Sequence, residues 1–144
     1  MLFYKVISLI YADLEITNYE DVTLAKKAYL SENEIRSLKL NTLVDSGAYM
    51  LTLPQHVVTQ LGLEKISQQE AELADGSIKL LDIVGPLKIA FENRMSITSA
   101  MVIPTGEPLL GTIPMEDLDV IIHPLTQKLV VNPDNPYVAK KKLK

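Results

Sequence analysis

An apolar stretch that ends in a single aspartate is the feature that most constrains what this chain can fold into. Residues 38–44 become continuously apolar toward their end, which is typical of a strand end that is buried on both faces. Asp45 follows directly and opens the tight turn Ser46-Gly47-Ala48. Burial disfavours the charged form of a carboxylate, so we expect a chain that brings an aspartate to this place to use it. The alternative is a turn aspartate that only caps backbone N–H groups of Gly47 or Ala48.

Short strand signals dominate the rest of the chain. Proline suits a first helical turn and glycine suits a helix end, so we expect one short helix from Pro54 to Gly62 and one helical turn at residues 114–118. The other periodic or apolar stretches predict strands at residues 6–17, 21–30, 34–44, 50–53, 64–74, 77–83, 87–92, 94–103, 109–111, 120–122 and 128–131. Many short strands with one or two short helices predict a mainly β fold, a closed or nearly closed β-barrel.

Length and composition restrict the class of protein. The 144 residues suit a single domain, 1–144, and the 47% of hydrophobic residues excludes a disordered chain. The formal net charge of −4 argues against a nucleic-acid binder, and we expect the basic residues 138–144 to be a solubilising tail. The chain has no cysteine, which excludes a cysteine nucleophile and thiolate metal sites. The apolar residues 1–11 are too short to cross a bilayer as a helix, so we expect no membrane partner and a cytoplasmic protein.

The sequence LVDSGA at residues 43–48 resembles the Asp-Thr/Ser-Gly-Ala signature of the retropepsin-like (retroviral-type, clan AA) aspartic peptidases. The resemblance covers about residues 35–131, which would be the core of the domain. Residues 53–54 (Leu-Pro) and 61–63 (Leu-Gly-Leu) resemble the bacterial and archaeal single-domain branch of that family. The resemblance implies a barrel of the acid-protease type. It also implies that the chain corresponds to half of a pepsin and works as a homodimer, because it supplies one catalytic aspartate, Asp45.

The same resemblance implies an endopeptidase in which Asp45 from each of two chains activates a water molecule. Two adjacent carboxylates cannot both be ionised, so the pair shares one proton and one member acts as base while the other acts as acid. Ser46 would fix the geometry of the pair, and Gly47 and Ala48 would shape the turn. The substrate would be an extended peptide or protein with apolar side chains near the cut, and neither a cofactor nor a metal is implied.

Two further elements fit the resemblance with less specificity. Asp75-Gly76 is a strong signal for a hairpin turn between the strands expected at residues 64–74 and 77–83. This hairpin is either an ordinary one or the flap that closes over substrate. The flap tip would consist of the four turn residues Ala74, Asp75, Gly76 and Ser77. The triplet that would pack behind the catalytic turn consists of Leu109, Leu110 and Gly111.

Other functions stay open on the residues alone. The same barrel can serve as a module that binds a peptide or protein without cleaving it, or as a structural or assembly protein. The two histidines, His56 and His123, are expected at the surface or in a turn. The acidic residues Glu116, Asp117 and Asp119 are expected to form a solvated face.

Overall fold

A computed structural model describes residues 9–143 of the chain. Its elements follow one another as β1 (Tyr11–Asn18), α1 (Tyr19–Lys26), the 3-10 turn η1 (Glu32–Glu34), β2 (Ser37–Val44), β3 (Leu51–Pro54), α2 (Gln55–Leu61), β4 (Glu64–Glu72), β5 (Ile78–Phe91), β6 (Arg94–Ile103), β7 (Leu109–Leu110), α3 (Thr112–Leu118), β8 (Val120–Ile122) and β9 (Leu129–Val131). None of these helices is long and apolar enough to cross a membrane, a statement that holds for the described part of the chain.

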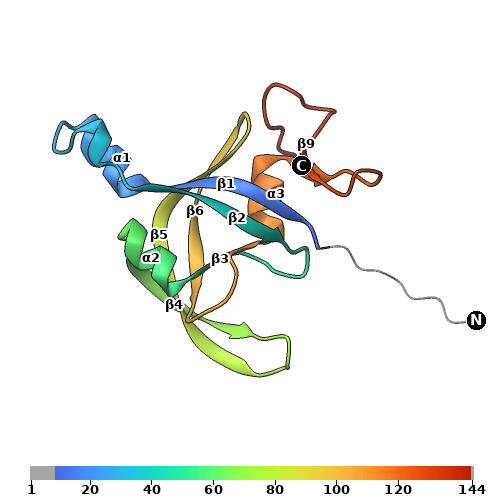
Figure 1. The fold of residues 1–144 in the computed structure, drawn as a ribbon, viewed down its shortest axis with the longest axis horizontal. Coiled ribbons are helices and arrows are strands. Elements are labelled where there is room, and N and C mark those ends of the chain that lie inside the picture. The colour runs from blue at the N-terminus through green and yellow to red at the C-terminus, as the bar shows by residue number, and fades with distance from the viewer. Residues whose placement is uncertain (1–8, 144) are drawn as a thin grey trace, which may run out of the picture.

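Seven of the strands form one sheet that closes on itself. The strand order is β1-β2-β7-β3-β6-β5-β4, and a further antiparallel pairing between β1 and β5 joins the ring. Among the described residues β4 pairs only with β5, and the two strands form a long hairpin that projects from the barrel (Figure 1). β8 and β9 form a separate two-stranded sheet near α3. The observed fold confirms the prediction of a mainly β, nearly closed barrel with few short helices.

Apolar side chains from every wall of the ring fill its interior. Burial of a large aliphatic side chain contributes roughly 1.5–3 kcal/mol to folding, so these residues supply most of the driving force. The largest of the fully buried ones come from β1, β3, α2, β5, β7 and α3 and are Leu14, Ile16, Leu51, Leu53, Leu61, Leu87, Ile89, Leu110 and Leu118. The strand and the helix on either side of residue 111 therefore both have an anchor in the core.

The strand expected at residues 21–30 is wrong, because α1 occupies this region and brings the α-helices to three among residues 9–143. The Asn18 side chain caps the helix by accepting a hydrogen bond from the Asp21 N–H at 3.1 Å. Asp21 is buried but satisfied, since its carboxylate accepts hydrogen bonds from the Arg36 side chain at 2.9 and 3.0 Å. The cap at Asn18 and this ion pair stabilise a helix where a strand was expected.

Several other boundaries differ from the expectation, most of them by one or two residues. The strand expected at residues 34–44 begins at Ser37 as β2, because η1 occupies Glu32–Glu34. The first strand begins at Tyr11, and residues 6–8 of the expected strand lie outside the described residues. β5 is one strand where two were expected, at residues 77–83 and 87–92, because a register shift between Val84 and Leu87 absorbs the irregularity within the strand. α3 is longer than the single turn expected at residues 114–118, because it starts at Thr112.

Candidate functional site

The Asp45 loop, residues 45–50, leaves the barrel at the end of β2. The Asp45 N–H donates to the Leu110 carbonyl at 3.0 Å, so the backbone at this point is still tied to β7. One carboxylate oxygen, Oδ1, accepts the Gly47 N–H at 2.9 Å, and the Ala48 N–H donates to the Asp45 carbonyl at 3.1 Å. Within residues 9–143 the other oxygen, Oδ2, accepts no hydrogen bond. The half-buried carboxylate is thus oriented through one oxygen and has the second available.

β7 fixes both ends of this loop. It lies between β2 and β3, the two strands that flank the loop in sequence. Leu43 and Val44 of β2 pair with Leu109 and Leu110 in parallel, while Thr52 of β3 pairs with Leu109 in the antiparallel sense. A loop whose two stems hydrogen-bond to one central strand has little freedom to shift relative to the core.

Gly111 brings the chain directly against the back of the loop. A Cβ added at Gly111 would lie 2.5 Å from the Met50 carbonyl oxygen and 2.7 Å from that of Ala48. The backbone here is extended, so the requirement for glycine comes from close approach and not from an unusual φ. The structure thus brings Leu109, Leu110 and Gly111 together with the loop.

The first residues of α3 continue this contact. The Thr112 N–H donates to the Ala48 carbonyl at 2.9 Å, and the Ile113 N–H donates to the Tyr49 carbonyl at 3.1 Å. The Thr112 hydroxyl also reaches the Ala48 carbonyl, at 3.4 Å. The N-terminal turn of α3 and the Asp45 loop are therefore one hydrogen-bonded unit.

The other residues of the turn lie as follows. Ser46 is exposed, and within residues 9–143 its side chain has no hydrogen-bond partner. A Cβ at Gly47 would approach Asp45 Oδ1 to 3.2 Å, so a larger residue would push on the carboxylate. Ala48 is half-buried, with its carbonyl held by α3. Ser46 is free to act on a group outside the chain, whereas Gly47 and Ala48 are part of the loop's internal support.

The hairpin turn places its four predicted residues at an exposed tip. Ala74, Asp75, Gly76 and Ser77 are all exposed, and Gly76 adopts a φ of 84° that favours glycine. The Ser77 hydroxyl and N–H both donate to Asp75 Oδ1, at 2.6 and 2.9 Å. These hydrogen bonds, the hydroxyl first, hold the pKa of Asp75 below its usual range. No hydrogen bond among residues 9–143 joins the tip to the Asp45 loop.

The histidines lie apart from this arrangement. His56 is exposed in α2. His123 accepts backbone N–H groups of Leu125 and Thr126 at its Nδ1, each at 3.2 Å, and so has a turn role. A hollow of about 590 Å³ lies beside α3, and neither Asp45 nor either histidine lines it.

The expectation of a solvated acidic face is wrong for Asp119. Its carboxylate accepts hydrogen bonds from the Asn132 side chain at 3.0 Å, the Asn135 side chain at 2.8 Å and the Lys140 N–H at 3.0 Å. The nearly fully buried Arg94 guanidinium lies 3.9 Å away. Asp119 thereby fastens residues 132–142, here called the strap, to the C-terminal end of α3. Sequence reasoning missed it because every partner is more than ten residues away.

Comparisons with known proteins give a result at the level of structure alone. No protein-family model and no curated protein sequence matches this chain. Among solved structures 198 chains match, one of them being the retroviral EIAV protease complexed with the inhibitor HBY-793. That chain superposes with a TM-score of 0.53 over 81% of this chain and 94% of its own, at 16% sequence identity. The chain has a retropepsin-like fold.

In this retropepsin-like fold the Asp45 loop is the candidate active site. It presents one carboxylate per chain, supported from behind by β7, Gly111 and α3. At 16% identity the likeness extends to the fold, so the assignment of chemistry depends on the loop itself.

Proposed function

We propose that this chain is an aspartic endopeptidase that acts as a homodimer, with Asp45 of each copy forming a water-activating pair. The observation that carries the proposal is the Asp45 loop. A retropepsin-like fold here delivers one partly buried carboxylate, oriented by the Gly47 N–H, at the end of a buried strand. One such loop per chain makes the site incomplete without a second copy.

The chemistry requires the pair to share one proton. The ionised carboxylate takes a proton from water as the water oxygen bonds to the carbonyl carbon of the substrate. The protonated carboxyl gives its proton to the carbonyl oxygen of the substrate as the tetrahedral intermediate forms. When the C–N bond breaks, the leaving nitrogen receives the proton that the other carboxyl took from water, and the hydroxyl of the intermediate returns its proton to the pair. Oδ2 of Asp45, which accepts no hydrogen bond within the described residues, is the carboxylate oxygen available for this proton exchange. Ser46, whose hydroxyl is exposed, supports the pair from the turn.

The substrate is an extended peptide or protein with apolar side chains near the cut. The hairpin of β4 and β5 is the element that would close over it, with residues 74–77 at its tip. Residues 53–54 and 61–63 support a place for this chain in the bacterial and archaeal single-domain branch of the retropepsin-like family. In this proposal residues 1–144 form one domain, and the protein is cytoplasmic.

The test is cleavage of a peptide library and of unfolded casein by the wild-type chain and by Asp45→Asn. Wild type should cleave and Asp45→Asn should not, while both keep the same circular dichroism spectrum and the same dimer. Asp13→Asn is the matched control, since Asp13 is exposed on β1 and its contact with Asn41 survives the change. Cleavage retained in Asp45→Asn would exclude the mechanism.

The runner-up is a module that binds an extended peptide without cleaving it. The observation in its favour is that Asp45 Oδ1 accepts the Gly47 N–H, as a turn aspartate with a purely architectural role also does. Saturable binding of library peptides by wild type and Asp45→Asn alike, with every peptide recovered intact, would favour this module.

A further inference from the structure

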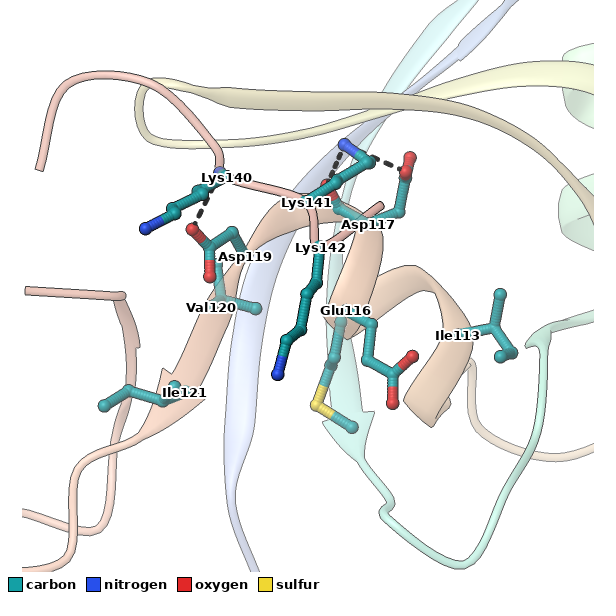
Figure 2. A pocket seen from close by; sticks show the side chains of 10 residues that line it. Ile113, Glu116, Asp117, Asp119, Val120, Ile121, Lys140, Lys141 and Lys142 are labelled. Atoms are coloured by element: carbon teal, nitrogen blue, oxygen red, sulfur yellow. Dashed lines mark hydrogen bonds and ion pairs between the residues drawn. The ribbon is translucent and has the colours of Figure 1, made fainter. Parts of the chain in front are cut away.

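The two ends of α3 are held by different parts of the chain. At its N-terminal end, the N–H groups of residues 112 and 113 donate to two carbonyls of the Asp45 loop at 2.9 and 3.1 Å. At its C-terminal end, Asp117 and Asp119 receive the strap, and Figure 2 shows these contacts with Ile113 at the other end of the helix. A helix of seven residues such as α3 is not stable alone, so its position depends on the groups that hold it.

The strap holds both the backbone and the side chain of the residue at which α3 ends. Asp119 adopts a φ of 54° and a ψ of 58°, a left-handed conformation that is unfavourable for residues with a Cβ. The Asn132 N–H donates to the Asp119 carbonyl at 3.1 Å. The Asp119 carboxylate accepts hydrogen bonds from the Asn132 side chain, the Asn135 side chain and the Lys140 N–H. These bonds determine where the helix stops and how its last turn lies.

A buried cation ties Asp119 and the strap to the barrel. The Arg94 guanidinium on β6 is nearly fully buried, lies 3.9 Å from the Asp119 carboxylate and donates to the Asn135 carbonyl of the strap. Among residues 9–143 no other carboxylate pairs with Arg94, and its Nε and Nη1 have no hydrogen-bond partner. Because an uncompensated buried cation is costly, the groups that neutralise Arg94 are held in place by it, and these are the groups that fix the strap.

Apolar packing adds little to this attachment. In the strap, Tyr137 and Val138 are 84% and 75% exposed. Lys141 adds polar contacts instead, since its Nζ lies 3.1 Å from the Asp117 carbonyl and 3.2 Å from the Asp117 carboxylate. A segment with few buried apolar contacts detaches locally when its polar bonds are lost. The barrel sheet does not unfold with it, because residues 132–142 contribute no strand to that sheet.

We infer that the strap positions the Asp45 loop through α3, with Asp119 as the positioning residue. The strap fixes the C-terminal end of the helix, the helix carries this constraint to its first turn, and that turn holds the carbonyls of Ala48 and Tyr49. The inference rests on the proposed function, because the position of the loop affects cleavage only if Asp45 is a catalytic residue. Release of the strap leaves the barrel closed and loosens the loop, so a change at the C-terminal segment reaches the carboxylate without touching it.

The test compares Asp119→Asn with Asp134→Asn in the full chain. At residue 119 an amide NH2 group replaces one carboxylate oxygen and faces groups that are themselves donors, so hydrogen bonds to the strap are lost. Asp134→Asn is the matched control, because Asp134 is an exposed residue of the strap whose carboxylate accepts no hydrogen bond from residues 9–143. Asn135→Ala is a milder second variant, which removes one hydrogen bond to Asp119 and keeps its charge.

Two measurements follow the loop without requiring cleavage. Amide hydrogen exchange of residues 112 and 113 reports the two bonds to the loop, and the Gly47 amide chemical shift reports the Asp45 carboxylate, which accepts that N–H. Asp119→Asn should speed exchange at residues 112 and 113 about tenfold or more relative to the amides of β5 and β6, and should move the Gly47 signal. Asn135→Ala should act in the same direction to a smaller extent, and Asp134→Asn should leave the exchange ratio within about threefold of wild type. If the wild type cleaves, Asp119→Asn should lower kcat and leave KM within about threefold.

The inference is overturned if Asp119→Asn and Asn135→Ala speed exchange equally throughout the chain and leave the Gly47 signal unmoved, since the strap then contributes stability alone. It is also overturned if Asp134→Asn has the effect of Asp119→Asn, or if the loop moves while kcat stays at the wild-type value. Cleavage that depends on Asp45, in a protein whose loop does not respond to the strap, would leave the proposed function standing and refute this inference. A loop that loosens in the strap variants of a protein without cleavage would uphold the link between strap and loop and refute the peptidase.

Discussion

Gly111→Ala is the substitution that tests the support of the Asp45 loop most sharply. The added Cβ would lie 2.5 Å from the Met50 oxygen, roughly 0.9 Å short of an ordinary van der Waals contact. The atoms it meets belong to the backbone and cannot rotate away. Either the loop or the N-terminal turn of α3 must move, and both are anchored, the first by β7 and the second by the buried Leu118.

The expected loss of stability is the sum of three contributions to the free energy of unfolding. Overpacking of this kind costs about 1–3 kcal/mol, and loosening the two hydrogen bonds from Thr112 and Ile113 adds about 1 kcal/mol each. The loss of glycine's freedom in the unfolded chain returns about 0.4–1 kcal/mol. We therefore expect Gly111→Ala to lower the free energy of unfolding by about 2–4.5 kcal/mol, which is about 7–15 °C in Tm for a chain of this length.

Urea denaturation followed by circular dichroism measures the stability, and amide chemical shifts of residues 45–50 report on the loop. Gly76→Ala is the control, since no atom lies within 4 Å of the Cβ it would add and its cost is only the strain of a left-handed residue, about 1 kcal/mol. It should leave the loop amides unchanged. Wild-type stability and unmoved loop amides in Gly111→Ala would refute the close packing on which the site depends.

Three further predictions concern charge. Asp21→Asn removes the buried anion that pairs with Arg36 and should lower the free energy of unfolding by about 1–3 kcal/mol in urea, and a change below about 0.5 kcal/mol would contradict it. Hydrogen bonds, first of all from Asn132, hold the pKa of Asp119 below its ordinary value of 3.8. The stability that Asp119 contributes is present above that ordinary value and is lost as the pH falls through the lowered pKa of the folded state. Thermal denaturation below about pH 4 should therefore fall less steeply for Asp119→Asn than for wild type, and parallel curves would argue against the strap anchor. Because a carboxyl pair that shares one proton needs both forms at once, cleavage should follow a bell-shaped pH profile with an acidic optimum, and a profile flat into alkaline pH would exclude the pair.

The sequence supports the barrel well because its signals are local. Alternating and continuous apolar stretches predict strands, and Asp75-Gly76 between two of them predicts the hairpin that the structure contains. The motif at residues 43–48 indicates a loop at a strand end, which is where Asp45 lies. The helix α1 was missed although its signals were present, an asparagine at the N-cap and acids in the first turn.

Features that depend on contacts between residues far apart in the sequence could not be predicted from it. Nothing local marks Asp119 as the anchor of the strap, since its partners Asn132, Asn135 and Lys140 are brought to it by the fold of α3, β8 and β9. The position of β7 between β2 and β3 is likewise a matter of topology. The closeness of Gly111 to the loop follows from that topology, and a glycine after two leucines gives no sign of it in the sequence.

A crystal structure of the dimer, with the distance measured between the Asp45 carboxylates of the two copies, tests the central claim most directly. The proposed peptidase requires the two carboxylates to meet across a twofold axis at about 3 Å, the separation at which one proton is shared. Carboxylates that lie far apart in every assembly of the protein would contradict the pair, and with it the proposed mechanism.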